Sequence, residues 1–141
     1  MLKIIIPGEP CAQGRPRFTT ISGHAVAYDP PKSKNYKAFV KELGENAVKK
    51  QGWQLFDLPI EMRLKAYLSV PKSKSKKFRE QALKGAERPT KKPDCSNIVK
   101  GIEDALNGVA YLDDKLIVKS VVEKWYSDNP RVEVYLQYAE I

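Results

Sequence analysis

Carboxylates gather around a single lysine in the C-terminal part of this chain. The candidate reactive side chains are Asp94, Lys100, Asp104, Asp113 and Asp114. Carboxylate oxygens are hard ligands that suit magnesium, and a lysine beside them can hold a phosphate group. In an otherwise basic protein, this combination is typical of metal-assisted attack on a nucleic-acid phosphodiester.

The charge is divided unevenly along the 141 residues. Residues 1–92 carry 20 Lys or Arg against 8 Asp or Glu, a net charge of +12, whereas residues 93–141 carry 5 against 9, a net charge of −4. This asymmetry indicates a polyanionic partner for the basic part. Charge alone would favour a solvated basic face on a soluble protein, and the acidic cluster shifts the interpretation to the polyanion.

Length and composition indicate one globular domain over residues 1–141, with 42% hydrophobic residues. No apolar run approaches the roughly 18 residues of a membrane span, and residues 1–6 are too short for a signal peptide. We therefore expect a cytoplasmic protein with no membrane partner. Cys11 and Cys95 are far apart and lack a CxxC spacing, which argues against a zinc knuckle or a disulfide framework.

The hydrophobic periodicity predicts the elements that must position the reactive side chains. Strands are expected at residues 2–6, 18–21, 25–28, 60–70, 116–125 and 132–138, and helices at 32–47, 76–84 and 96–107. The turn at Asp128-Asn129-Pro130 predicts that the last two strands form an antiparallel hairpin. The expected fold class is α+β, a single compact domain in which helices pack on one side of an antiparallel or mixed β-sheet.

The third expected helix carries most of the reactive residues. Ser96 is a plausible N-cap and Asn107-Gly108 a stop signal. At 100° per residue, Asn97, Lys100 and Asp104 share the polar face. A helix of about 12 residues is roughly 18 Å long, so the loops 93–96 and 111–114 meet only if the chain folds back after the helix.

A basic segment directly precedes Asp94. Residues 71–92 hold nine Lys or Arg against Glu80 and Glu87. A solvated linker is the ordinary explanation for such a stretch, but its position favours a mobile arm that contacts DNA phosphates. The candidate DNA-binding residues, here and in the Gly-Pro-rich N-terminal loop, are Arg15, Arg17, Lys72, Lys74, Lys76, Lys91 and Lys92.

Together these motifs resemble a known signature. Lys-Pro-Asp-x-x-Asn-x-x-Lys at residues 92–100, Asp-Ala-Leu-Asn-Gly at 104–108 and Tyr-x-Asp-Asp at 111–114 look like the RusA-like Holliday-junction resolvases, which are crossover junction endodeoxyribonucleases of bacteria and prophages. Residues 8–10 and 14–18 are similar to the family's opening. The resemblance implies a homodimer that binds four-way or branched DNA and uses Mg²⁺ or Mn²⁺ to make paired nicks during recombination and repair.

The resemblance also implies roles for individual residues. By position it assigns catalysis to Asp94, Lys100 and Asp114, and metal binding to Asp94 and Asp114, with Asp113 as a further ligand. Asn97 and Asp104 would lie beside the metal site, together with Ser96. Lys100 would steady the scissile phosphate, and the alternative for Lys100 is a surface pair with Asp104 at i,i+4.

Ser96 departs from the family pattern, which has a carboxylate at that position. A neutral hydroxyl is a poorer magnesium ligand, although Asp113, Asp104 or Glu103 could supply the missing charge. Three interpretations follow: an active enzyme with altered ligands, a weakened enzyme, or a DNA-binding protein that has lost cleavage. We favour the active enzyme, because carboxylates that face phosphates would not help a protein that only binds DNA.

Overall fold

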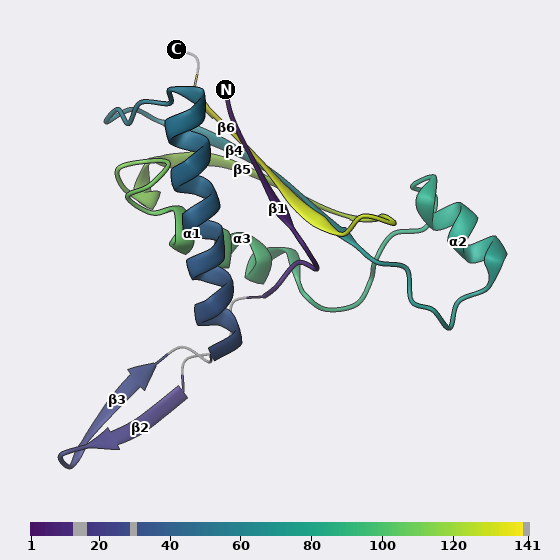
Figure 1. The fold of residues 1–141 in the computed structure, drawn as a ribbon, viewed down its shortest axis with the longest axis horizontal. Helices are drawn as coiled ribbons and strands as arrows, with labels where there is room; N and C mark the ends of the chain where they lie inside the picture. The colour runs from purple at the N-terminus through teal and green to yellow at the C-terminus, as the bar shows by residue number, and fades with distance from the viewer. Residues whose placement is uncertain (13–16, 29–30, 140–141) are drawn as a thin grey trace.

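The computed structural model describes residues 1–12, 17–28 and 31–139, and its centre is a four-stranded sheet. The strand order is β1 (Leu2–Pro7), β6 (Arg131–Tyr138), β4 (Ile60–Leu68) and β5 (Ile117–Tyr126). Strand β6 is antiparallel to both β1 and β4, whereas β5 runs parallel to β4. The sheet is therefore mixed, and two helices, α1 and α3, cover one of its faces, which confirms the predicted α+β class (Figure 1).

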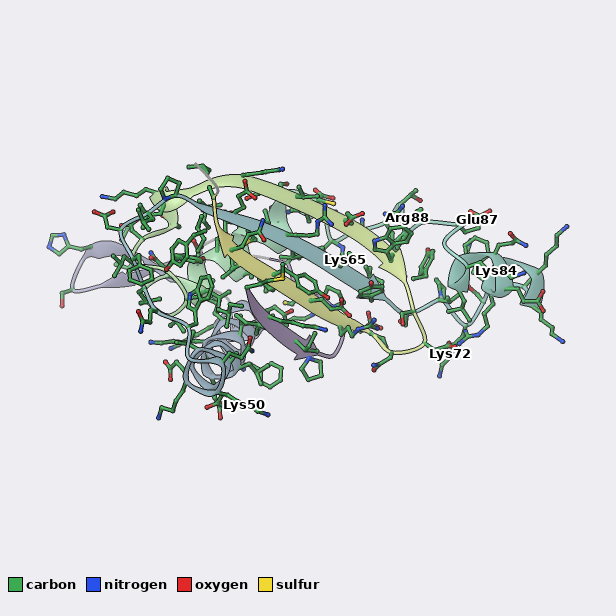
Figure 2. The ribbon with its side chains drawn as sticks, turned by 90° about the horizontal axis from the view of Figure 1, so that it is seen from above. Lys50, Lys65, Lys72, Lys84, Glu87 and Arg88 are labelled. Atoms are coloured by element: carbon green, nitrogen blue, oxygen red, sulfur yellow. The ribbon has the colours of Figure 1, made fainter. Side chains whose placement is uncertain are left out.

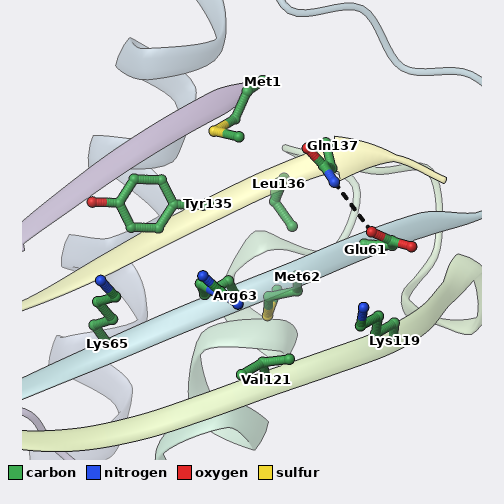
Figure 3. Close-up of a pocket in the computed structure, with 10 residues that line it drawn as sticks. All are labelled: Met1, Glu61, Met62, Arg63, Lys65, Lys119, Val121, Tyr135, Leu136 and Gln137. Carbon is green, nitrogen blue, oxygen red and sulfur yellow. Dashed lines mark hydrogen bonds between the residues drawn. The ribbon is translucent and has the colours of Figure 1, made fainter. Parts of the chain in front are cut away.

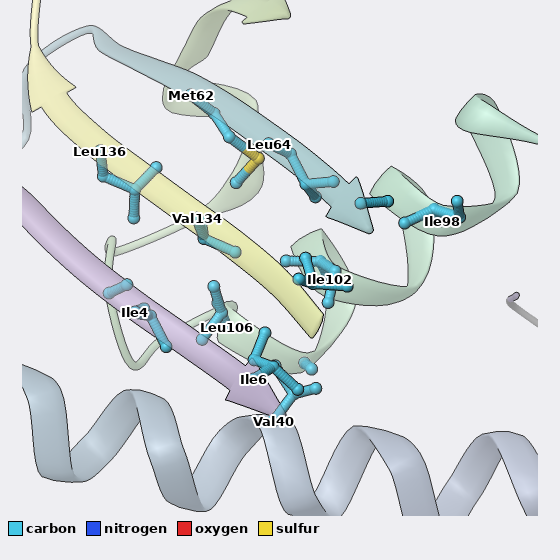
Figure 4. Close-up of a cluster of buried hydrophobic side chains, with 14 of the residues drawn as sticks. Ile4, Ile6, Val40, Met62, Leu64, Ile98, Ile102, Leu106, Val134 and Leu136 are labelled. Atoms are coloured by element: carbon cyan, nitrogen blue, oxygen red, sulfur yellow. The ribbon is translucent and has the colours of Figure 1, made fainter. Parts of the chain in front are cut away.

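Hydrophobic and polar residues alternate strictly along the strands, and this alternation gives the sheet the hydrophobic face that the helices cover. In β4, Ile60, Met62, Leu64, Ala66 and Leu68 are all buried, while the residues between them point to the other side. The buried side chains of the sheet pack against α1 (Pro31–Gln51) and α3 (Cys95–Leu106), as Figure 4 shows. Because side chains alternate along a strand, the opposite face of the sheet is left polar and open.

Helices α1 and α3 approach each other closely at one glycine. A Cβ built on Gly44 in α1 would lie 2.5 Å from Cδ2 of Leu106, the last residue of α3. Leu106 is itself fully buried, so it has little room to move aside. This contact fixes how far α3 stands from α1 and therefore where the polar face of α3 lies.

The predicted C-terminal hairpin is wrong. Strands β5 and β6 do not pair, because β4 lies between them in the sheet. The chain leaves β5 and crosses the end of β4, where the Ser127 amide donates to the Leu68 carbonyl at 2.9 Å. Alternation within a strand predicts which of its faces is buried, but it does not predict which strand lies beside it. The turn at residues 128–130 was therefore not enough to predict that β5 and β6 pair.

Two smaller elements extend from opposite ends of the sheet (Figures 1 and 2). The predicted hairpin of β2 (Arg17–Ile21) and β3 (His24–Tyr28) is confirmed as a separate two-stranded sheet. Its turn residues, Ser22 and Gly23, both have positive φ, as a two-residue type I′ turn requires. The predicted helix at 76–84 is α2 (Lys76–Leu83), whose N-terminus is capped by the Ser75 hydroxyl. No helix in the described part of the chain is long and apolar enough to span a membrane.

The close contact at Gly44 leads to a stability prediction. Gly44→Ala should lower the free energy of unfolding by about 1–3 kcal/mol, because the new methyl group overpacks against Leu106. Alanine is the better helix former by about 1 kcal/mol, so packing must outweigh propensity for this result. The measurement is urea denaturation, with Asn46→Ala at an exposed position of α1 as the control. A Gly44→Ala variant as stable as the wild type would show that the helices are not tightly packed here.

Candidate active site

Helix α3 starts earlier than its sequence predicts. Its N-cap is Asp94, whose carbonyl accepts the Ile98 amide at 3.0 Å, so the predicted N-cap Ser96 lies inside the first turn. The Asp94 side chain makes no capping hydrogen bond and is exposed. The predicted C-terminal stop is confirmed, because Asn107 is the C-cap and Gly108 follows with a φ of 78°.

Burial divides α3 into two faces. The core takes Ile98, Gly101, Ile102, Ala105 and Leu106. Val99 packs beside these residues, and the polar side chains form a row along the helix that consists of Ser96, Asn97, Lys100, Glu103 and Asp104. The row runs from exposed residues at the N-terminal end to the half-buried Glu103 and Asp104 at the other end.

The loop after α3 folds back onto the C-terminal half of that helix. Tyr111 is buried, and its hydroxyl donates to the Glu103 carbonyl at 2.6 Å. The Trp53 indole donates to the Ala110 carbonyl at 2.8 Å, and the Gly108 amide donates to the Tyr111 carbonyl at 2.9 Å. These bonds hold the segment that leads into Asp113 and Asp114 beside the polar row.

Asp113 and Asp114 form a coupled pair at the start of the short 3₁₀ helix η1 (Asp114–Leu116). The Asp113 carboxylate accepts the Lys115 amide at 2.9 Å, and this bond lowers the pKa of Asp113. A hydrogen bond with Asp113 raises the pKa of Asp114; burial and the charges of Asp113 and Asp104 also raise it, while Lys100 opposes them. Two carboxylates that share a hydrogen bond are held together more easily when a proton or a cation lies between them.

Glu103 and Lys37 also belong to this site. Burial raises the pKa of Glu103, the charges of Asp114 and Asp104 add to the shift, and Lys100 and a hydrogen bond with Ser120 oppose it. From α1, the Lys37 ammonium lies 3.8 Å from a carboxylate oxygen of Asp104. The sequence pointed to Glu103 only as a substitute carboxylate, although it follows Lys100 at the i+3 position of the same face. Nothing in the sequence pointed to Lys37, which reaches the site from a distant helix.

The predicted residues are therefore divided between two ends of α3. Lys100 and Asp104 lie within electrostatic reach of Asp114. Asp94 precedes Asp104 by ten residues, which corresponds to about 15 Å along the helix axis. Asn97 and Ser96 lie in the first turn, close to Asp94, and the electrostatic contacts of Asp114 are with Asp113, Asp104 and Lys100.

The donor set suits a magnesium ion that keeps most of its water. No group of three or more His, Cys, Asp or Glu side chains in the described ranges is placed so that it could hold a metal ion. Magnesium rarely needs such a group, because it usually binds one or two carboxylates and completes its shell with water and phosphate oxygens. The adjoining carboxylates of Asp113 and Asp114, with Asp104 nearby, fit that requirement.

The predicted DNA-binding residues occupy separate parts of the molecule. Arg15 lies outside the described residues, and Arg17 is the first residue of β2. The predicted lysines of the basic segment are all exposed, at or before α2 (Lys72, Lys74 and Lys76) or just before α3 (Lys91 and Lys92). They therefore line the chain on both sides of α2 and lead directly to Asp94.

The second half of the basic segment is fastened to the sheet and is not a detached arm. The Arg88 guanidinium lies 3.4 Å from the ring centroid of Trp125 in β5, and its Nε donates to the Lys124 carbonyl at 2.7 Å. The Lys124 ammonium donates in turn to the Lys91 carbonyl at 2.6 Å. This anchoring fixes Lys91 relative to β5, a placement that the charge pattern did not reveal.

The electrostatics of Glu103 give a pH-dependent prediction. Its raised pKa means that the folded state binds protons more tightly than the unfolded state, so ionisation destabilises the fold above the folded pKa. Without added metal, Glu103→Gln should therefore raise the free energy of unfolding at pH 7. That gain should shrink as the pH falls, and disappear below the unfolded pKa of about 4.3.

The measurement is denaturant unfolding between pH 4 and pH 8, with EDTA present. Glu42→Gln, an exposed position of α1, is the matched control for loss of one carboxylate. A gain from Glu103→Gln that is the same at pH 4 and pH 7 would contradict the assigned cause.

Comparison with known proteins agrees with this geometry. The profile of the family described as endodeoxyribonuclease RusA matches residues 7–137, nearly the whole chain. The chain is also 44% identical over 138 residues to the uncharacterized protein YqaN of Bacillus subtilis strain 168, a match that covers 96% of this chain and 95% of that protein. The polar row, the coupled aspartates and the Tyr-x-Asp-Asp loop all fall inside the matched region, and the chain belongs to the RusA endodeoxyribonuclease family.

Proposed function

We propose that this protein is a metal-dependent, structure-selective endonuclease that resolves four-way DNA junctions by paired nicks. The observation that carries the proposal is the adjoining carboxylates of Asp113 and Asp114 within electrostatic reach of Lys100, in a basic chain of the RusA family. Carboxylates are unfavourable next to DNA phosphates unless a cation lies between them. Their position in the loop beside the polar row of α3 thus supports a site where cation and phosphate meet.

Each residue has a distinct task in this proposal. Asp114 and Asp113 would hold Mg²⁺ or Mn²⁺, which supplies Lewis-acid polarisation of the phosphate and a more acidic water. Lys100 holds a phosphate oxygen and offsets the charge that develops there. The ion pair between Asp104 and Lys37 supports this role for Lys100, because Asp104 already has a cation from α1.

Asp94 enters as the further metal ligand that the family resemblance implies. In the protein alone it lies at the other end of α3 from Asp104. Sharing an ion with Asp114 would link the N-terminal turn of α3 to the 111–114 loop. The exposed lysines next to Asp94 are suitably placed to hold the DNA backbone beside it.

The remaining expectations belong to the same proposal. A four-way junction has two-fold symmetry, and two equivalent nicks are most simply made by a homodimer. We therefore propose a homodimer that acts in the cytoplasm on recombination intermediates. A branched substrate also suits a chain whose basic segment and hairpin extend from opposite ends of the sheet (Figure 2).

The first test is cleavage of a labelled four-way junction in Mg²⁺ or Mn²⁺. Asp114→Asn and Lys100→Met should each lower the cleavage rate by about 100-fold or more, a loss typical of removing an electrostatic group that acts in the transition state. Asp94→Asn tests whether that carboxylate takes part. Asp57→Asn, at an exposed loop position, is the control and should cut like the wild type. An Asp114→Asn variant that cuts normally would remove Asp114 from the site.

Ser96 provides the second test, because it decides between an active enzyme and a protein that only binds junctions. Its exposed position in the first turn of α3 allows a carboxylate without steric conflict. If the wild type is active, Ser96→Asp should lower the Mg²⁺ concentration needed for half-maximal cleavage, because it adds a negative charge near Asp94. A wild type that binds junctions without nicking them, and gains nicking through Ser96→Asp, would favour the binding protein.

A further inference from the structure

The face of the sheet that the helices leave open contains a broad depression. Its volume is about 510 Å³, and it extends over β4, β5 and β6 on the side away from α1 and α3 (Figure 3). The residues that line it are Met1, Glu61, Met62, Arg63, Lys65, Lys119, Val121, Tyr135, Leu136 and Gln137. None of the residues assigned to the nuclease site is among them.

Cations outnumber acids around this depression. Arg63, Lys65 and Lys119 line it, against one carboxylate, Glu61, which already accepts the Gln137 amide at 3.1 Å. In the sheet Arg63 lies between Tyr135 and Val121, so neither neighbour across the strands is acidic. Lys65, in contrast, lies between Glu133 and Glu123, and Lys119 lies opposite Glu61. Arg63 is therefore the cation of the lining that has no acidic neighbour across the strands, and the Lys3 ammonium adds a further cation 5.6 Å from the ring centroid of Tyr135.

An aromatic ring lies flat among these cations. Figure 3 shows Tyr135 with the face of its ring directed out of the sheet, beside Arg63 and Lys65. The Tyr135 hydroxyl donates to Glu133 at 2.6 Å, and Glu133 accepts the Arg131 side chain at 2.7 Å. Arg131 in turn lies over the ring of Tyr67, 4.0 Å from its centroid. This chain of contacts holds Tyr135 in position before any partner arrives.

A flat aromatic ring surrounded by cations on an open sheet is the arrangement that unpaired nucleic-acid strands use. A base stacks on the ring, and the cations contact the phosphates on either side of it. We propose that this face binds an unpaired nucleic-acid strand, with one base on Tyr135 and its phosphates near Arg63, Lys65 and Lys119. This second site goes beyond the proposed nuclease site and lies on the opposite side of the sheet.

Charge favours this occupant over a second copy of the chain. Two such faces brought together would oppose like charges, which costs binding energy, whereas a polyanion complements them. Contacts to phosphate also release counterions, so the affinity of this site should fall as salt rises.

The test measures binding of a fluorescent oligothymidylate by anisotropy, with EDTA present so that nothing is cleaved. Tyr135→Leu should weaken binding about fivefold or more, as expected for the loss of one stacked base. Arg63→Gln should weaken binding and reduce the slope of log affinity against log salt by about 0.7, the value for one phosphate contact on a single strand. Tyr135→Phe keeps the ring and should bind more tightly than Tyr135→Leu.

Lys49→Gln is the control for general loss of charge, because it removes an exposed lysine of α1 far from this face. It should bind like the wild type. Equal binding by wild type, Tyr135→Leu and Arg63→Gln would overturn the proposal. A change in particle mass of the Tyr135→Leu variant in sedimentation would overturn it too, because the face would then be an interface between copies.

The outcome is separable from that of the nuclease proposal. Asp114→Asn should lose junction cleavage and keep oligothymidylate binding, whereas Tyr135→Leu should weaken oligothymidylate binding. A wild type that never cuts junctions but needs Tyr135 for oligothymidylate binding would refute the nuclease and support this second site.

Discussion

The packing of α3 between the sheet and α1 is the constraint on which the rest of the structure depends. Ile98, Ile102 and Leu106 enter the core and fix the rotation of α3 about its axis. Gly44 allows α1 to come close enough to seal that core. Once the apolar face is fixed, the polar row has only one direction to face, and the loop after α3 brings Asp113 and Asp114 to it.

The candidate site concentrates negative charge within a protein that is basic as a whole. Cations reach it from two elements, Lys37 from α1 and Lys100 from α3 itself. Because the charges of Asp104 and Asp113 raise the pKa of Asp114 further, the cluster is not fully balanced by these lysines. The remaining excess of negative charge is suited to a divalent cation. The basic segment beside the cluster is suited to DNA.

Local patterns predicted most elements of the fold. The errors arose where contacts between distant parts of the chain determine the structure. The alternation of residues 60–70 and the helical spacing of Ile98, Ile102 and Leu106 are local, and both elements formed, although β4 ends at Leu68 and α3 begins before the predicted N-cap. The hairpin prediction failed because β5 pairs with β4, which lies about 50 residues earlier in the chain. In the site, Lys100 and Asp104 follow from helix geometry alone. The contacts of Lys37, and the anchoring of the basic segment to Trp125, required the folded chain.

The parallel pairing of β5 with β4 has a consequence for how the protein folds. The connection between these strands contains the whole basic segment, α2, α3 and the aspartate loop. Closing so long a connection costs chain entropy before contacts between the strands can offset that cost, and contacts between distant residues slow folding. The candidate site and the edge of the open face that β5 provides should therefore form together, late in folding. A nascent chain that has not yet placed β5 would lack both surfaces.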